Sequence, residues 1–95
     1  MEEYYVYAHY KPDSDVPFYI GKGKGKRAHS ARNRNQHWKN LVKKHRFFAE
    51  LLFEQISNET ALQMEMDLIR MWGRMDIGTG PLVNWTDGGE GSSGQ

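Results

Sequence analysis

The chain has 95 residues, enough for one small domain with a single hydrophobic core. It contains no cysteine, which excludes disulfide bonds and thiolate zinc sites and fits a reducing compartment such as the cytoplasm. Twelve aromatic residues and a net charge of only +1 are not typical of a disordered chain. No apolar run approaches the roughly 18 residues of a membrane span, and no signal peptide opens the chain, so we expect a cytoplasmic protein with no membrane partner.

The charges are strongly segregated along the chain. Residues 1–20 carry a net charge of −3, residues 21–46 carry +10 with no acid, and residues 47–95 carry −6. Such a dense block of like charge favours a polyanion, and therefore nucleic acid, as the partner. The alternative is a solvated basic face without a partner. The candidate DNA contacts are basic residues of this block, Lys22, Lys24, Lys26, Arg32, Arg34, Lys39 and Lys43.

The first predicted element is an antiparallel hairpin. Residues 4–10 are rich in tyrosine and have high strand propensity, residues 11–15 favour a turn, and residues 18–21 form the second strand. Because side chains alternate along a strand, Tyr7 and Tyr19 are expected to share one face of the hairpin. Aromatic packing alone is one interpretation of this pair, and a role in a functional site is the other.

The second strand continues into a segment in which glycine and lysine alternate, residues 21–27, ending at Arg27. Glycine permits crowded or left-handed backbone, and the cations lie where a phosphate could approach backbone N–H groups. The segment is not a P-loop, because no serine or threonine follows Lys26. It is not a dinucleotide fingerprint either, because the glycines are spaced as G-x-G-x-G. We predict a phosphate-handling loop.

Two less regular segments follow. Residues 27–34 predict a short helix, and a basic amphipathic helix begins after Asn35, with apolar residues recurring at helical spacing from Trp38. Residues 46–56 fit either a helix or a buried strand. We predict a strand, because a two-stranded hairpin alone is marginally stable and a third strand completes a sheet.

The clearest helix lies between Ser57, a plausible N-cap, and Gly73, a plausible C-cap. At 100° per residue, Glu65 falls in the middle of the apolar stripe of this helix. A carboxylate that faces a core is costly unless it is paired or binds a cation. The alternatives are a buried ion pair, with Arg27 or a lysine, and a metal ligand.

The last segment, residues 78–89, is rich in turn-forming residues. It surrounds a short apolar piece that we expect to close the core, Leu82, Val83 and Trp85. Asn84 is positioned to cap or brace backbone near the site. We expect one domain over residues 1–89 and a flexible tail or linker over residues 90–95, with further protein after it in the parent gene.

Five features in this order resemble the motifs of the GIY-YIG nuclease family: Tyr5-Val6-Tyr7, Tyr19-Ile20-Gly21, Arg27, Glu65 on a helix, and Asn84. The chain is most similar to phage and mobile-element homing-type endonucleases, with which it shares a Gly-Lys-Gly loop and a closing Asn-x-Thr-Asp-Gly-Gly segment. The resemblance covers essentially the whole chain. It implies an α+β fold with a small three-stranded antiparallel sheet flanked by helices, and the host cytoplasm as location if a phage encodes the protein.

The resemblance also implies endonuclease activity on double-stranded DNA with one Mg²⁺ ion, for which Mn²⁺ is a substitute. It implies catalytic roles for Tyr7, Tyr19, Arg27, Asn84 and Glu65, the last as metal ligand. In our hypothesis Tyr7 is the general base, and nearby cations, first among them Lys22, favour its phenolate; Arg27 holds a phosphate oxygen, and Tyr19 orients the water or the phosphate.

The chain departs from the family pattern in two places. The first motif reads Tyr-Val-Tyr in place of Gly-Ile-Tyr, and Ala31 stands where many members have a histidine. His29, two residues after Arg27, is the candidate for that missing role. A DNA-binding module without catalysis, using residues 21–46, is the main alternative function, and a structural domain whose aromatic residues only pack is a third.

Overall fold

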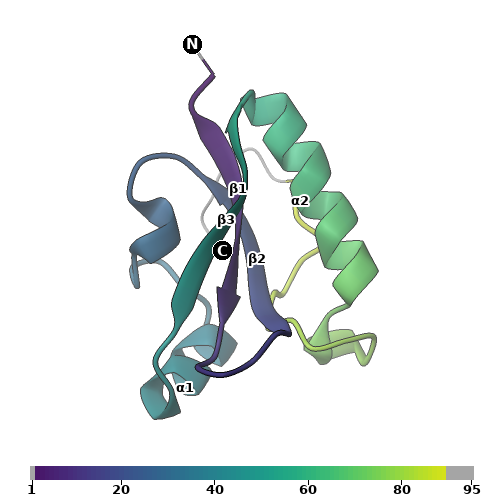
Figure 1. The fold of residues 1–95 in the computed structure, drawn as a ribbon. Helices are drawn as coiled ribbons and strands as arrows, with labels where there is room; N and C mark the ends of the chain where they lie inside the picture. Colours follow the sequence, from purple (N-terminus) through teal and green to yellow (C-terminus); the bar gives the residue numbers. More distant parts are fainter. Residues whose placement is uncertain (1, 90–95) are drawn as a thin grey trace.

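The computed structural model describes residues 2–89, which form an α+β fold, as predicted (Figure 1). The expected tail, residues 90–95, lies outside the described residues. In chain order the strands, α-helices and short 3₁₀ helices are β1 (Tyr4–Tyr10), β2 (Pro17–Gly23), η1 (Arg27–His29), α1 (Gln36–Lys44), β3 (Phe48–Ile56), α2 (Asn58–Trp72) and η2 (Met75–Ile77).

The three strands form one antiparallel sheet in the order β2-β1-β3. In the hairpin, Tyr7 pairs with Gly21 and His9 with Tyr19. The strand predicted within residues 46–56 is confirmed as β3, which pairs with the free side of β1 and so satisfies backbone groups on both strands. β2 is left at an edge of the sheet, with one row of backbone groups unpaired by any strand.

The alternation of side chains in β1 divides the core between the two faces of the sheet. Tyr5 and Tyr7 pack with Trp38 of α1, whereas Val6 and Ala8 pack against α2. Figure 1 shows α2 along one face of the sheet and the segment with η1 and α1 on the other. We call these the α2 face and the α1 face.

The caps predicted for the two α-helices are confirmed, because their signals are local, whereas the short helix predicted over residues 27–34 is a 3₁₀ helix over Arg27–His29 alone. The Asn35 side chain accepts a hydrogen bond from the Trp38 N–H at 2.8 Å, and the Ser57 hydroxyl accepts one from the Thr60 N–H at 3.0 Å. Gly73 is the C-cap of α2. Both N-caps satisfy donors that a helix leaves free at its first turn.

The segment after α2 closes the core only in part. Leu82 and Val83 are buried as predicted, but the expectation for Trp85 is wrong, because 45% of this residue is exposed. Arg74 donates a hydrogen bond to the Trp85 carbonyl at 2.7 Å. The indole ring then packs edge-on against His37, with the ring centroids 5.7 Å apart.

The dimensions are those of a small domain. The Cα radius of gyration is 12.3 Å, close to the roughly 12 Å expected for a compact chain of this length. Among the described residues, no helix combines the length and the apolar character needed to cross a membrane.

Candidate active site

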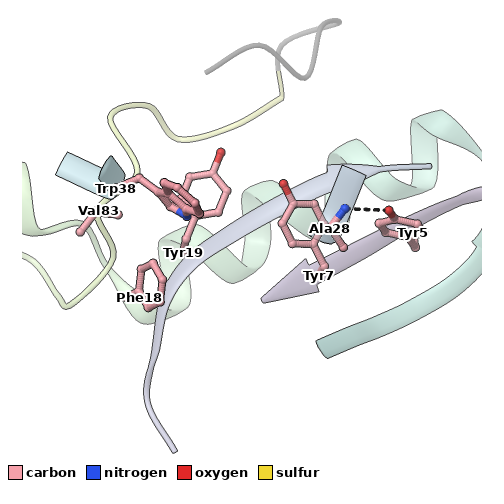
Figure 2. Packing of buried hydrophobic residues seen from close by; sticks show 7 residues of the cluster. All are labelled: Tyr5, Tyr7, Phe18, Tyr19, Ala28, Trp38 and Val83. Carbon is pink, nitrogen blue, oxygen red and sulfur yellow. Dashed lines mark hydrogen bonds between the residues drawn. The ribbon is translucent and has the colours of Figure 1, made fainter. Parts of the chain in front are cut away.

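Two buried tyrosines lie together on the α1 face, beside the edge strand β2. The rings of Tyr7 and Tyr19 have centroids 6.3 Å apart, and Figure 2 shows their hydroxyl groups pointing in the same direction. The predicted sharing of one face is confirmed. The two phenol oxygens therefore form a pair of polar groups at one side of an otherwise aromatic cluster.

The glycines of β2 provide bare backbone beneath two of the candidate residues. A Cβ atom at Gly21 would overlap the ring and hydroxyl of Tyr7, and one at Gly23 would lie 2.7 Å from the side chain of Arg27. Gly25, by contrast, has a positive φ of 60° and open space around it. Two of the three glycines are thus needed for close approach, and the third for backbone conformation.

The loop after β2 is tied to β1 through Tyr5. Its hydroxyl donates to the Gly25 carbonyl at 2.8 Å and accepts from the Ala28 N–H at 2.9 Å, the second of which is drawn in Figure 2. A single buried phenol therefore fixes both ends of the turn that leads into η1. This turn positions Arg27, which lies between the two anchored residues.

His9 is a structural residue. Trp38 donates its indole N–H to His9 Nδ1 at 3.0 Å, and because indole is only a donor, Nδ1 must be unprotonated. The proton lies on Nε2, which donates to the Ala28 carbonyl at 2.7 Å. Burial lowers the pKa of His9 to about 3. The imidazole stays neutral at pH 7 and has both nitrogens engaged, so it is not a candidate base.

Arg27 is half-buried at the start of η1 and faces the loop that follows. Its guanidinium donates from Nη1 to the Arg32 carbonyl at 2.6 Å and from Nη2 to the Asn33 carbonyl at 3.1 Å. These two hydrogen bonds fix the plane of the guanidinium. A fixed planar donor group suits the recognition of a phosphate.

Arg34 occupies a different position from the one predicted. We expected a DNA phosphate contact, but only 4% of the residue is exposed, and Nη1 donates to the Tyr7 hydroxyl at 2.6 Å. The guanidinium also lies over the rings of Tyr7 and Tyr19, 5.4 and 5.2 Å from their centroids. The loop turns this side chain inward, so the expectation is wrong.

Lys22 also differs from the prediction, both as a DNA contact and as the cation beside Tyr7. Only 5% of it is exposed, and it pairs in register with Val6, so it points to the α2 face, away from Tyr7. There Nζ donates to the Asn58 side chain at 2.8 Å and lies over the ring of Tyr4. The alternation of the strand is the physical reason.

The remaining predicted DNA contacts are exposed on the protein surface, as a phosphate contact requires: Lys24, Lys26, Arg32, Lys39 and Lys43. Lys24 forms an exposed ion pair with Glu3 at 3.8 Å, which contributes little to stability. His29 is exposed too. The contacts that connect Tyr7 with Tyr19 and Arg34 do not involve its side chain.

Glu65 faces inward from α2, as predicted, with 7% of the residue exposed. Its Oε1 accepts a hydrogen bond from the Gly89 N–H at 3.3 Å, and the turn at Gly88 lies directly against the carboxylate. Because β2 is an edge strand, side chains from both faces can meet beside it. The carboxylate is close enough for its charge to raise the pKa of both Tyr7 and Tyr19.

Asn84 braces the edge strand, as expected for a role near the site. Its Nδ2 donates to the Ile20 carbonyl at 2.8 Å, and its Oδ1 accepts from the Ile20 N–H at 3.1 Å. The Val83 N–H donates to the Phe18 carbonyl at 2.7 Å. This segment therefore replaces a fourth strand along β2, flanks Tyr19, and continues to the turn that contacts Glu65.

Burial dominates the ionisation of the two phenols. It raises the pKa of Tyr7, an effect that Arg34 and then Arg27 partly offset, and it raises the pKa of Tyr19 as well. Arg34 and Arg27 favour the Tyr7 phenolate, as our hypothesis expects of nearby cations, but burial outweighs them and the pKa of Tyr7 is raised overall. Both phenols are neutral in the free protein at pH 7.

The donor set suits a weakly held hard cation better than a caged one. Within residues 2–89, no group of three or more His, Cys, Asp or Glu side chains is arranged to hold a metal ion. Mg²⁺ commonly keeps several waters and takes one or two carboxylates together with substrate phosphate. Glu65 fits that pattern, because it is a single buried carboxylate whose charge acts on both phenols, and it would share the ion with a phosphate.

Sequence reasoning missed the role of Arg34 and overvalued Lys22. Both stand in one basic block, and composition cannot distinguish a cation that turns inward from one that stays in solvent. For Lys22 a signal existed, because strand alternation from Tyr19 and Gly21 places it on the opposite face. For Arg34, which lies in an irregular loop, no local pattern indicates the direction of the side chain.

Comparisons of this chain with protein-family models, with the curated proteins and with the solved structures found no match. A functional assignment therefore depends on the arrangement of the side chains described above.

Proposed function

We propose that this chain is a Mg²⁺-dependent endodeoxyribonuclease of the GIY-YIG type that hydrolyses phosphodiester bonds in double-stranded DNA. One observation supports this most: Arg34 connects the two buried phenols, Tyr7 and Tyr19, to the backbone of Arg27. The buried carboxylate of Glu65, on α2, is near enough for its charge to raise the pKa of both phenols. Hydrolysis of a phosphodiester needs a base, donors for the developing negative charge and stabilisation of the leaving oxygen. Tyr7 could meet the first need and Arg27 the second, and a Mg²⁺ ion held by Glu65 would supply the third.

Tyr7 is the group proposed to accept the proton of the attacking water. Because burial raises its pKa, the phenolate is a minor species at neutral pH, and the cleavage rate should rise with pH through the alkaline range. Tyr19 has its hydroxyl beside that of Tyr7 and is proposed to orient the water or the phosphate. Tyr7→Phe should lower kcat by roughly 10²–10⁴-fold and flatten the pH profile.

Arg27 and Glu65 are proposed to hold the phosphate from two sides. Arg27 would donate to a non-bridging oxygen with its planar guanidinium, whose orientation two backbone carbonyls fix. Glu65 would hold Mg²⁺, which supplies charge neutralisation at the phosphate when it is bound. Asn84 keeps the edge strand in place between these groups and is proposed to act through position alone.

The surface cations of residues 21–46 are proposed to bind the DNA backbone. Seven of the ten basic residues of this block are exposed: Lys24, Lys26, Arg32, Lys39, Lys43, Lys44 and Arg46. Figure 1 shows that the loop and helix that carry most of them lie on the side of the sheet opposite α2. A duplex on that side would bring a phosphate toward the phenol pair.

Glu65→Gln is the direct test of the nuclease function. Plasmid DNA is incubated with the purified protein with and without Mg²⁺, and cleavage is followed by the loss of supercoiled substrate. We expect Mg²⁺-dependent cleavage by the wild type and its loss in Glu65→Gln, with DNA affinity equal or higher because a negative charge is removed. Glu59→Gln, an exposed change near the start of the same helix, is the matched control. Cleavage retained by Glu65→Gln would contradict the metal role.

A DNA-binding module without catalysis is the second candidate, favoured by the same exposed cations. It predicts salt-dependent binding of duplex DNA by the wild type and by Glu65→Gln alike, with no cleavage by either at any Mg²⁺ concentration. The same plasmid experiment therefore distinguishes the two functions.

A further inference from the structure

Arg34 carries a positive charge in an interior, largely aromatic environment. Its guanidinium lies over three rings, of which Trp38 is the third, at 5.4 Å from the centroid. Its three hydrogen bonds go to neutral oxygens: the Ser30 carbonyl at 3.1 Å from Nε, the Tyr7 hydroxyl at 2.6 Å and the Arg27 carbonyl at 2.8 Å. Burying a cation is costly. A neutral side chain would fill this space at a lower cost, so the charge itself requires an explanation.

The hydrogen bond to Tyr7 has a direction that chemistry determines. Arginine is only a donor, so the Tyr7 oxygen must accept, and its own O–H together with its second lone pair must point elsewhere. Figure 2 shows that the Tyr7 hydroxyl points in the same direction as that of Tyr19. Arg34 thus sets the orientation in which Tyr7 presents its hydroxyl group.

Arg34 also connects Tyr7 to the other cation of the site. The same guanidinium that bonds Tyr7 holds the backbone carbonyl of Arg27, and it stacks over Tyr19. Three candidate residues from β1, β2 and η1 are therefore held in register by one side chain. A shift of about 1 Å in such a set is enough to cost catalysis a large factor.

We propose that Arg34 is a positioning residue of this site, which holds the Tyr7 oxygen as a hydrogen-bond acceptor, directs its hydroxyl toward the substrate, and does not contact DNA. The inference rests on the proposed nuclease function. It separates Arg34 from its exposed neighbour Arg32, although the two are equivalent by composition.

A double-mutant cycle tests whether Arg34 acts through Tyr7. Steady-state cleavage is measured for the wild type, Arg34→Gln, Tyr7→Phe and the double variant. We expect Arg34→Gln to lower kcat by about 10- to 100-fold, the effect of losing one charge-assisted hydrogen bond, with KM changed less than about 2-fold. In the Tyr7→Phe background the same change should cost less than about 3-fold. Fully additive losses would overturn the proposal.

The salt dependence of DNA binding tests whether Arg34 contacts a DNA phosphate. Binding is measured by fluorescence anisotropy against salt concentration in the non-cleaving Glu65→Gln background. Arg34→Gln should leave the slope of log affinity against log salt concentration unchanged. Loss of one phosphate contact reduces the magnitude of that slope by about 0.9, which is the result expected for Lys39→Gln. A reduction of that size for Arg34→Gln would assign it to the DNA backbone and overturn the proposal.

Two further variants distinguish a loss of activity from a loss of folded protein. Arg34→Lys keeps the charge and one donor for Tyr7 but loses the fork, so we expect a kcat between those of the wild type and Arg34→Gln. Arg70→Gln removes an exposed charge from α2 and should change neither kcat nor the melting temperature. Equal losses of kcat in Arg34→Lys and Arg34→Gln, with unchanged melting temperatures, would overturn the proposal, because the charge and the donor that lysine retains would then contribute nothing at Tyr7.

Failure of the proposed function is distinguishable from failure of this inference. If the wild type does not cleave DNA in Mg²⁺, the proposed nuclease function is wrong. The contact between Arg34 and Tyr7 is then tested by ¹⁹F NMR of protein labelled with 3-fluorotyrosine. The Tyr7 signal, identified from its loss in Tyr7→Phe, should move in Arg34→Lys and stay in place in Arg70→Gln. A Tyr7 signal that Arg34→Lys does not move would overturn the inference.

Discussion

At the scale of single residues, the candidate site depends on two glycines, Gly21 and Gly23, as much as on its polar side chains. Tyr7 extends across β2 because Gly21 has no Cβ, and Arg27 crosses Gly23 for the same reason. The alternation of glycine and lysine thus gives β2 two different faces. The glycines leave room for Tyr7 and Arg27 on one face, and Lys22 projects from the other.

Gly21→Ala should displace Tyr7. The new methyl group would overlap the phenol ring, and overpacking of this kind costs about 1–3 kcal/mol of unfolding free energy. We expect a lower urea midpoint and a strong loss of cleavage. Gly78→Ala is the control, since Gly78 has a φ of 73° but nothing within 4 Å of a Cβ; it should cost about 1 kcal/mol and leave cleavage unchanged. Normal stability and cleavage in Gly21→Ala would contradict the steric role.

His9 should make the fold sensitive to acid. Its pKa is lowered to about 3 in the folded protein, so the unfolded chain binds a proton below its ordinary pKa of 6.5 while the folded chain does not. The contribution of His9 to the free energy of unfolding is therefore fully present above pH 6.5. It falls by about 1.4 kcal/mol per pH unit as the pH drops toward 3. Urea unfolding between pH 7 and pH 4 should show this additional slope in the wild type and lose it in His9→Gln. His29→Gln, at an exposed position, should keep it.

At the scale of elements, the edge strand β2 is the part of the fold that most needs the rest of the chain. A strand edge presents unpaired backbone groups, and here the segment after α2 covers them through Val83 and Asn84. The amide of Asn84 supplies one donor and one acceptor to the same residue, Ile20. Only asparagine and glutamine combine a carbonyl acceptor and an NH₂ donor in one side-chain amide.

Asn84→Asp should therefore destabilise the domain. The change replaces the donor that faces the Ile20 carbonyl by a second acceptor at a fully buried position, which costs about 1–3 kcal/mol or more. Chemical denaturation at pH 7 measures this loss. Asn40→Asp is the matched control, because Asn40 is exposed on α1 and uses only its oxygen, as an acceptor from Gln36. Equal stabilities for the two variants would exclude the bracing role.

The element predictions succeeded where the signals were local. Asn35 and Ser57 were recognised as helix N-caps because a cap contacts its own helix within three residues. The prediction for residues 46–56 was ambiguous in sequence, because a short apolar run fits a helix or a strand. Pairing with β1 decided it. Trp85 was misjudged because its surroundings are set by residues distant in sequence: its carbonyl accepts from Arg74 and its ring packs against His37.

At the scale of the whole molecule, the segregation of charge along the chain becomes a segregation in space. The basic block forms the loop and helix on one side of the sheet, and α2, with Glu59 and Asp67 exposed, lies on the other (Figure 1). Two members of that block, Lys22 and Arg34, are withdrawn from the surface, so the block is less basic to a ligand than its net charge suggests.

Duplex binding should depend on the exposed cations of α1. Lys39 and Lys43 are four residues apart and exposed on the same helix, so both can face one backbone. The double change Lys39→Gln with Lys43→Gln should reduce the magnitude of the log–log salt slope by about 1.8 if both contact phosphates. Arg70→Gln on α2 should not alter it. An unchanged slope in the double variant would place the DNA elsewhere.

The hairpin, the two α-helices with their caps, the shared face of Tyr7 and Tyr19 and the inward orientation of Glu65 were all predictable from the sequence, because strand alternation and helical periodicity relate residues that are close along the chain. Only the tertiary structure decided which cations face the phenols. Arg34 turns inward because the Tyr7 hydroxyl and two backbone carbonyls accept its donors, and Lys22 turns away because of its register with β1. Such choices depend on contacts between segments that are far apart in the chain, and a linear pattern of charge does not record them.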